Sequence, residues 1–273
     1  MDILLDIGGT KTRVAATSDG KTFSEPIIID TAQLYEEGKN DLIDVARRVS
    51  NHGPVEGIFG GIKGVVSEDG QTPLTAPLML DWKDKQLGAD LKAALGASSA
   101  RFVNDTALVG LGEAIYGGGK GIDMVAYLTV STGVNGARIM SGAIDRTHIG
   151  FEIGGQYLSM NEPAQSLEDL VSGVAISRRF GMHPKELGKE HPVWEELARV
   201  LAFGVHNTIV HWSPDIVVIG GSMMNEIGIP VPRVAEHVAH IMRKFPSVPP
   251  IVHSELGDIG GLWGALALLT VHR

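Results

Sequence analysis

The chain has 273 residues, of which 35 are glycine and none is cysteine, and its formal net charge is −9. A chain without cysteine forms no disulfide, thiolate zinc site, iron–sulfur cluster or cysteine nucleophile, and the acidic balance excludes a basic nucleic-acid footprint over the whole protein. Hydrophobic residues make up 44%, which excludes a disordered chain. The longest uncharged runs are shorter than the roughly 20 residues of a membrane span, and the first residues show no signal-peptide pattern, so we expect a cytoplasmic protein.

The first part of the chain predicts alternating strands and helices. The apolar segments 3–7 and 12–17 flank Gly8-Gly9-Thr10, a pattern typical of two strands joined by a glycine turn. Apolar periodicity then predicts a helix over 39–51, a strand over 55–62 with a loop marked by Gly60, Gly61 and Gly64, a helix over 87–95, a strand over 100–103 and a helix over 106–116 that opens at Asn104-Asp105.

The second part of the chain begins with the same pattern as the first. A strand over 124–130, a turn at Ser131-Thr132-Gly133 and a strand over 134–140 repeat the first hairpin, and each second strand contains an arginine, Arg13 or Arg138. Two similar halves predict duplicated α/β domains around a cleft. Further elements are expected near 166–180 (helix), 192–211 (helix), 216–219 (strand, ending at Gly220-Gly221) and 262–269 (helix).

Two glycine turns are candidate phosphate loops. In the first, a carboxylate at a strand end, Asp6, is followed by glycines and hydroxyl residues up to Thr12. Backbone N–H and hydroxyl groups can donate to phosphate there, and the aspartate can hold a hydrated Mg²⁺. The second turn, Ser131 to Gly136, follows a strand in the same way. Each motif alone is equally consistent with a hairpin turn that binds nothing, but the pair favours a polyphosphate chain gripped from two sides.

Asn104-Asp105 stands at a predicted strand-to-helix junction. Asn and Asp are the commonest helix N-caps, so capping alone explains the pair. The functional alternative uses the same geometry. A helix N-terminus stabilises an ionised Asp105, which could then take the proton of a substrate hydroxyl during phosphoryl transfer.

Three further segments are candidate ligand contacts. Glu152 lies among glycines in residues 150–155, an unusual place for a solvated charge, and a carboxylate there can accept hydrogen bonds from sugar hydroxyls. Glu168 lies at a predicted helix start, where the helix dipole by itself favours an acid. Gly220-Gly221 after an apolar strand either lets a flat ring lie against the backbone or forms an ordinary turn.

These motifs, in this order over almost the whole chain, resemble those of the ROK (repressor, open reading frame, kinase) sugar kinases. The resemblance implies an actin/hexokinase-like (ribonuclease H-like) α/β fold of two duplicated domains with an interdomain cleft, each domain a five-stranded mixed sheet with helices. It implies Asp105 as catalytic base and Mg²⁺ organised through water by Asp6. It further implies sugar contacts at Gly61, Gly64, Asn104, Asp105, Glu152 and Glu168, and donor contacts at Asp6, Gly8, Gly9, Thr10, Lys11, Thr12, Thr132, Gly133, Gly136, Gly220 and Gly221.

The chain departs from the family pattern at several positions. Gly155 stands where many members have a zinc-binding histidine, and residues 161–166 lie where their cysteine cluster would be, so we expect no zinc site. Leu78 takes the place of a sugar-contacting asparagine, and Lys63 the place of a common proline. Compact zinc-free members include polyphosphate-dependent glucokinases, so the resemblance implies either ATP or polyphosphate as the donor.

The resemblance predicts a kinase that phosphorylates a hexose hydroxyl, with glucose O6 as the default, in a homodimer with no nucleic-acid or membrane partner. We expect a smaller N-terminal domain of residues 1–105 plus 259–273 and a larger C-terminal domain of residues 106–258. A non-catalytic sugar or nucleotide sensor of the same fold is the alternative, motivated by Gly155, Leu78 and Lys63. An actin-like filament protein shares only the N-terminal loop and does not account for the Glu152 segment.

Overall fold

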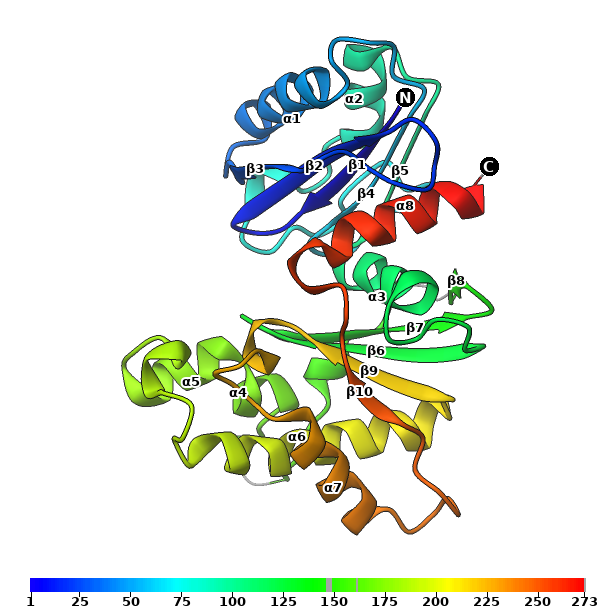
Figure 1. Cartoon of the computed structure of the whole chain (residues 1–273). Helices are drawn as coiled ribbons and strands as arrows, with labels where there is room; N and C mark the ends of the chain where they lie inside the picture. The colour runs from blue at the N-terminus through cyan, green and yellow to red at the C-terminus, as the bar shows by residue number, and fades with distance from the viewer. Residues whose placement is uncertain (146–148, 161, 273) are drawn as a thin grey trace. The chain divides into compact units, whose positions relative to one another are not determined.

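The computed structural model describes residues 1–145, 149–160 and 162–272 (Figure 1). Residue contacts divide them into two compact units, which are described separately. Unit 1 consists of residues 1–112, 149–150 and 258–272, and unit 2 of residues 113–145, 151–160 and 162–257. The residues from Asp105 to Gly112 belong to unit 1, where Gly112 packs directly against Gly264.

Unit 1 is built on a five-stranded mixed sheet in the order β3-β2-β1-β4-β5. β2 is antiparallel to β1 and β3, whereas β4 and β5 are parallel to β1. α1 and α2 cover one face of the sheet and α8 the other (Figure 1). The elements are β1 (Asp2–Ile7), β2 (Lys11–Thr17), β3 (Ile27–Asp30), α1 (Tyr35–Val49), β4 (Gly57–Ile62), α2 (Leu87–Leu95), β5 (Ser99–Asn104), α8 (Gly260–His272) and the first part of α3 (Asp105–Tyr116), whose residues 113–116 belong to unit 2.

Unit 2 repeats this topology. Its sheet has the order β10-β9-β6-β7-β8, with β7 antiparallel to its neighbours and β9 and β10 parallel to β6. The prediction of duplicated α/β units is therefore confirmed at the level of strand order. The elements are β6 (Met124–Val130), β7 (Val134–Met140), β8 (Ala143–Ile144), α4 (Leu167–Val171), α5 (Gly173–Phe180), α6 (Val193–Trp212), β9 (Ile216–Gly220), α7 (Val231–Ile241) and β10 (Ile251–His253).

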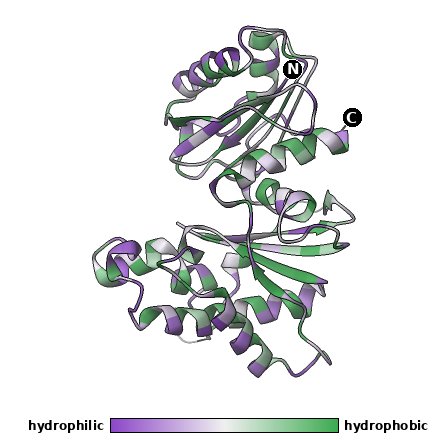
Figure 2. Ribbon diagram, in the orientation of Figure 1, coloured by the Kyte–Doolittle hydropathy of each residue, from purple (hydrophilic) through white to green (hydrophobic). Residues whose placement is uncertain are grey.

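Each unit has its own hydrophobic core. In unit 1 the central strands are buried on both faces, and Leu42, Trp82 and Phe102 fill the space between sheet and helices. In unit 2 the core lies between β6, β9 and the helices α4, α6 and α7, with Leu201 and Trp194 fully or almost fully buried. Figure 2 shows the corresponding apolar colouring along the strands and along α8.

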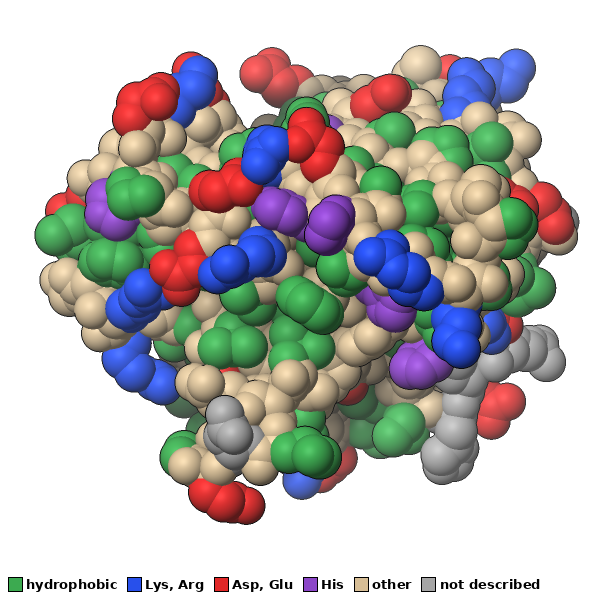
Figure 3. All heavy atoms as spheres, turned by 90° about the horizontal axis from the view of Figure 1, so that it is seen from below, with side chains coloured by type: hydrophobic (Ala, Val, Ile, Leu, Met, Phe, Trp, Pro, Cys, Tyr) green, Lys and Arg blue, Asp and Glu red, His purple; other side chains and the backbone are tan. Residues whose placement is uncertain are grey.

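The outer faces of α6 and α7 are polar. Arg233 of α7 donates to both carboxylate oxygens of Glu195 of α6, at 2.8 and 2.7 Å, and also contacts Glu236. His237 joins this cluster 2.9 Å from Glu195. Positive and negative side chains are interspersed on the face seen in Figure 3, as in an ordinary solvated helix surface. None of the helices in the described ranges has the length and apolar character that crossing a membrane requires.

Three details differ from the sequence predictions. The single helix expected near 166–180 is wrong: Ser172 adopts an extended conformation and caps α5, so two helices replace one. Gly60 and Gly61 lie inside β4 rather than in a loop after it. The short edge strands β3, β8 and β10 were not predicted, because two to four residues at a sheet edge carry little periodic signal.

Candidate active site

The carboxyl ends of three parallel strands form one edge of the sheet in unit 1. Ile7 of β1, Ile62 of β4 and Asn104 of β5 lie in one row across the sheet. The residues that follow this row begin the first glycine loop, the loop after β4, and α3. Ligand sites of open α/β sheets lie at this end of the strands. The structure thus brings together the predicted phosphate loop and the predicted catalytic base.

The first glycine loop is held in place by Thr31. Its hydroxyl donates to the Gly8 carbonyl at 2.8 Å, and its backbone N–H donates to the Thr10 carbonyl at 2.9 Å. The Thr12 hydroxyl is buried and lies 2.9 Å from that of Thr31. Thr12 therefore supports the loop from inside unit 1. The Gly8 and Thr10 carbonyls are engaged, and the Gly8 N–H donates to the Lys11 carbonyl at 3.1 Å. The turn can therefore offer the N–H groups of Gly9 and Thr10 to phosphate, but not that of Gly8.

Two side chains cover Gly9 at the centre of this loop. A side chain at Gly9 would lie 2.9 Å from Leu78 Cδ1 and 3.4 Å from Lys63 Cδ. Glycine is thus required by close neighbours as well as by the turn. Lys11, the loop's other cation, forms an exposed ion pair with Asp30 at 2.5 Å.

Asn104 performs the capping role that the sequence allowed. Its Oδ1 accepts from the Ala107 N–H at 3.1 Å, and its Nδ2 donates to the Gly64 carbonyl at 2.9 Å. Both ends of the amide are therefore engaged in fixing the start of α3 and the loop after β4. Gly64 has φ +112, and a side chain there would lie 2.2 Å from the Thr75 carbonyl oxygen.

Asp105 is the first residue of α3 and is partly buried. Its Oδ1 accepts from the Thr106 N–H at 2.8 Å. Gly61 permits this arrangement, because a side chain there would lie 3.1 Å from Asp105 Cα. Desolvation raises the pKa of Asp105, and the positive charge of Lys63 opposes that rise. A carboxylate with a raised pKa at a loop edge is suited to general-base chemistry.

Asp6 projects into the same edge of unit 1. Its side chain is 13% exposed, and its closest cation is Arg13, whose Nη1 lies 3.6 Å from Oδ2. The start of α8 packs directly on it, because a side chain at Gly261 would lie 2.3 Å from Asp6 Cγ. Burial raises the pKa of Asp6 to about 6; Arg13 counteracts this, and the nearby charge of Asp105 adds to it.

Asp6 suits a hydrated magnesium ion. Mg²⁺ is usually held by one or two carboxylates together with water and substrate phosphates. Asp6 and Asp105 are close enough for one charge to raise the pKa of the other, so a divalent cation between phosphate and Asp6 would relieve an existing electrostatic cost. In the ranges that the structure describes, no group of three or more His, Cys, Asp or Glu residues could hold a metal by itself.

The second glycine loop lies in unit 2 and is supported by Glu168. The Val134 N–H donates to Glu168 Oε2 at 2.7 Å, and a side chain at Gly133 would lie 2.5 Å from the same oxygen. The Gly173 N–H donates to the Ser131 carbonyl at 2.7 Å, which docks the start of α5 on the loop. Glu168 thus holds the loop here, and its contact with sugar stays a prediction.

The predicted nucleoside segment lies beside this loop. Gly221 has φ +100, and a side chain there would lie 2.3 Å from the Val130 carbonyl oxygen at the end of β6. Gly220 is similarly crowded by Ser254 and the Tyr127 hydroxyl. Gly136 is different. It lies within β7, where Ile153 occupies the space of its missing side chain.

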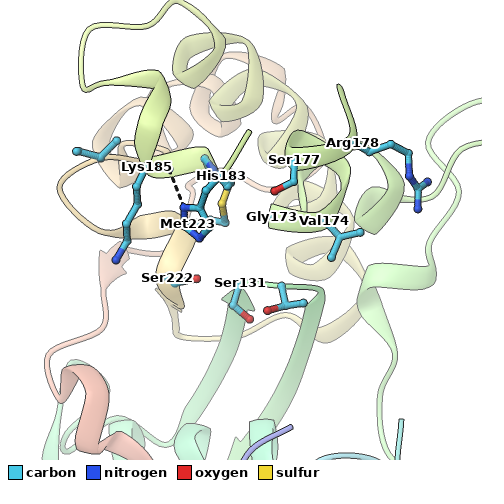
Figure 4. A pocket seen from close by; sticks show the side chains of 12 residues that line it. Ser131, Gly173, Val174, Ser177, Arg178, His183, Lys185, Ser222 and Met223 are labelled. Carbon is cyan, nitrogen blue, oxygen red and sulfur yellow. Dashed lines mark hydrogen bonds between the residues drawn. The ribbon is translucent and has the colours of Figure 1, made fainter. Parts of the chain in front are cut away.

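A cavity of about 610 Å³ opens next to the second loop (Figure 4). Thr132 and Ser222 line it, together with the basic side chains Arg178, His183 and Lys185. Lys185 and Arg178 stand at opposite sides of the cavity, and the Lys185 N–H donates to His183 Nδ1 at 3.2 Å. The volume is typical of a small-molecule site, and the positive charges of Arg178 and Lys185 suit an anion. Sequence analysis missed these three residues because they belong to no motif.

The segment around Glu152 is open. Glu152 is exposed and precedes a single 3₁₀ turn, Ile153–Gly155. A side chain at Gly155, where many family members have a histidine, would meet no atom within 4 Å. Of the stretch predicted at the place of a cysteine cluster, residue 161 lies outside the described residues, and Ser166 caps α4 through Asp169.

Two units with one strand order and a glycine loop at each sheet edge define a hexokinase-like α/β protein. The chain belongs to the ROK family, whose family model matches residues 3–271. A fructokinase from Pediococcus pentosaceus is 27% identical over 284 residues, covering 97% of this chain and 96% of that protein. A glucokinase from Thermotoga maritima is 26% identical over 308 residues, with coverage of 97% and 96%.

The fold also matches solved structures. A ROK family glucokinase from Streptomyces griseus, in complex with glucose and AMPPNP, has a TM-score of 0.82 and 22% identity, covering 98% of both chains. The predicted family and the predicted fold class are therefore both confirmed.

Proposed function

We propose that this protein is a sugar kinase that transfers the terminal phosphoryl group of ATP to a hydroxyl group of a hexose. Asp105 is the observation that supports this most strongly. It stands at the carboxyl end of β5, beside Gly61 of β4, and only β4 separates it from β1, which leads into the first glycine loop. Its pKa is raised. A raised pKa brings a carboxylate closer to the pH at which a general base is most effective.

In this proposal the other residues position the reactants. Asp105 accepts the proton of the sugar hydroxyl, and Asn104 fixes the start of α3 that carries it. The N–H groups of Gly9 and Thr10 in the first loop donate to the donor's phosphates. Magnesium, held through water by Asp6, supplies charge neutralisation when bound. The cavity beside Thr132 and Ser222 takes the donor's nucleoside end.

We propose glucose as the first sugar to test and fructose as the second, since the two relatives described above are named a glucokinase and a fructokinase. ATP is the preferred donor, supported by the AMPPNP complex of the similar structure, with polyphosphate as the alternative. We further propose a cytoplasmic homodimer, on the family resemblance alone; sedimentation of the purified protein tests its oligomeric state.

A second candidate is a non-catalytic sugar or nucleotide sensor. Leu78 and Gly155 favour it, because each lacks the polar side chain that the family pattern places there. Against it stands the raised pKa of Asp105 at the carboxyl end of β5, which suits a general base.

A matrix of hexoses against ATP and polyphosphate, with wild type and Asp105→Asn, tests the proposal. Asn keeps the size of the side chain and the acceptor for the Thr106 N–H but cannot take a proton. We expect kcat to fall by about 10²–10⁴-fold, while Asp44→Asn, at an exposed carboxylate of α1, stays at the wild-type rate. Near-normal turnover by Asp105→Asn would contradict the base assignment. Calorimetric binding without turnover in the wild type would favour the sensor.

A further inference from the structure

Lys63 occupies a central place at the sheet edge of unit 1. It directly follows Ile62, the middle member of the row that includes Ile7 and Asn104. The register therefore places Lys63 between Gly8, which begins the first glycine loop, and Asp105, which begins α3. Its backbone N–H donates to the Ile7 carbonyl at 3.2 Å, which fixes it beside the loop.

The side chain of Lys63 also runs toward the first glycine loop and Asp105. Its Cδ lies 3.4 Å from the point where a side chain at Gly9 would begin, so the aliphatic stem runs over the loop. Its ammonium group acts on the other neighbour, because the charge of Lys63 is the largest influence that opposes the raised pKa of Asp105. Asp6 from β1 and Arg13 from β2 also lie at this edge.

The charge of Lys63 is available to a ligand. Among the ion pairs of residues 1–145, 149–160 and 162–272, none involves Lys63, and its side chain is only partly buried. Lys11, by contrast, is already paired with Asp30. A cation that lies between a phosphate loop and a catalytic base, and that forms no ion pair with any residue the structure describes, points to an anion that occupies the space between them.

We propose that Lys63 binds the phosphoryl group in transit between donor and acceptor and stabilises its charge in the transition state; this rests on the proposed kinase function. In that step the bond between the terminal phosphorus and the donor's bridging oxygen breaks, and ADP leaves with the electron pair. A new bond forms between phosphorus and the sugar hydroxyl oxygen, whose proton passes to Asp105. Lys63 keeps its own proton and donates hydrogen bonds to the equatorial oxygens, where charge is concentrated.

Lys63→Met and Lys63→Arg, measured beside the wild type, test this inference. Methionine keeps an unbranched stem of similar length without charge, and arginine restores the charge. We expect Lys63→Met to lower kcat by about 10²–10³-fold with the Michaelis constants for sugar and donor within about threefold of the wild type. Lys63→Arg is expected to recover most of that loss. Lys21→Met, at an exposed turn, is the matched control and should keep full activity.

A binding measurement gives a readout apart from turnover. ADP with aluminium fluoride and sugar imitates the phosphoryl group in transit, and its calorimetric affinity should fall in Lys63→Met by a factor similar to that in kcat, with ADP alone unaffected. If the wild type is active and Lys63→Met keeps the wild-type kcat, with or without a raised Michaelis constant for sugar, this inference is overturned while the kinase function stands. A wild type inactive with every sugar and donor would overturn the kinase function and this inference with it.

Discussion

Asp6 shows how a residue can serve function at the expense of stability. The carboxylate is almost buried, its nearest cation is 3.6 Å away, and burial raises its pKa from 3.8 to about 6. The folded protein therefore keeps this proton up to a higher pH than the unfolded chain does. It follows that the free energy of unfolding falls as pH rises from about 4 to about 6, and that the full cost of the charge is present above pH 6.

Asp6→Asn should accordingly stabilise the protein and inactivate it. In buffer with EDTA at pH 8, we expect the free energy of unfolding to rise by about 1–3 kcal/mol, because Asn is neutral and of the same shape. The gain should shrink toward pH 4.5, and activity with Mg²⁺ should be lost at any pH. Urea unfolding at both pH values measures this, with the exposed Asp44→Asn as control. A gain that is independent of pH would show that ionisation of Asp6 is not its source.

Leu78, near the first loop, has a strained backbone conformation. Its φ is +73, a region that costs an ordinary side chain about 1–2 kcal/mol, and 53% of it is exposed. Its side chain contacts the first loop, where its Cδ1 lies 2.9 Å from the position that a Cβ at Gly9 would take. Backbone strain that persists beside a candidate site is typical of functional positions.

Leu78→Asn should relieve this strain, because asparagine adopts the left-handed region more readily than leucine. We expect the free energy of unfolding to rise by about 0.5–1 kcal/mol, and the sugar Michaelis constant to fall if the amide reaches the sugar as the family pattern implies. Leu80→Asn is the matched control, since Leu80 is 82% exposed but has no positive φ. A loss of stability in Leu78→Asn would show that its contact with the loop outweighs the strain.

The crossing of α3 and α8 depends on glycine. A side chain at Gly264 would lie 1.9 Å from the Leu108 carbonyl oxygen, and one at Gly112 would lie 2.7 Å from the Gly264 nitrogen. Both helices belong to unit 1 at this crossing. The close approach brings the start of α8 against Asp6, so the glycines of two helices decide where a candidate site residue lies.

Gly264→Ala should therefore destabilise unit 1 by about 2 kcal/mol or more, even though alanine favours a helix by about 1 kcal/mol over glycine. Neither neighbour can move aside, since both are backbone. Gly155→Ala is the control, because a methyl group there meets no atom within 4 Å and should leave stability unchanged. Equal stability of Gly264→Ala and wild type in urea would contradict this account of the crossing.

The sequence predicted those elements whose residues are buried in a regular period. Strands such as 124–130 and helices such as 192–211 were found within a few residues. The break at Ser172 was missed because residues 166–180 keep a helical pattern on both sides of it, and the decisive bond, from Ala175 N–H to Ser172 Oγ at 3.1 Å, is local capping chemistry. The apolar period of a sequence reflects which residues are buried, whereas a helix cap depends on the chemistry of a single side chain.

The same distinction, between features with a sequence pattern and features without one, applies to the site residues. Asp6, Asn104 and Asp105 were predicted because they stand at strand ends, where topology brings residues together. Arg178 and Lys185 were not, because their relation to Thr132 depends on how α5 and the following loop fold back over the second glycine loop. A contact of that kind has no signal in sequence spacing.

For the whole molecule, the repeated strand order has a consequence for folding. Each unit encloses a separate core, and each contains two of the four tryptophans: Trp82 and Trp263 in unit 1, Trp194 and Trp212 in unit 2. Units with their own cores unfold separately unless contacts between them are strong. We therefore predict that each unit has an opening free energy of its own.

A pair of core truncations tests this. Leu42→Ala in α1 and Leu201→Ala in α6 each remove a side chain that is at most 2% exposed, one from each core, and each should lower the opening free energy of its own unit by about 2–4 kcal/mol. In native-state hydrogen exchange, Leu42→Ala should weaken protection of β1 and β4 but not of β6 and β9, and Leu201→Ala the reverse. If each variant weakened both sheets equally, the two units would unfold as one cooperative body, and the topological repeat would not be a repeat in stability.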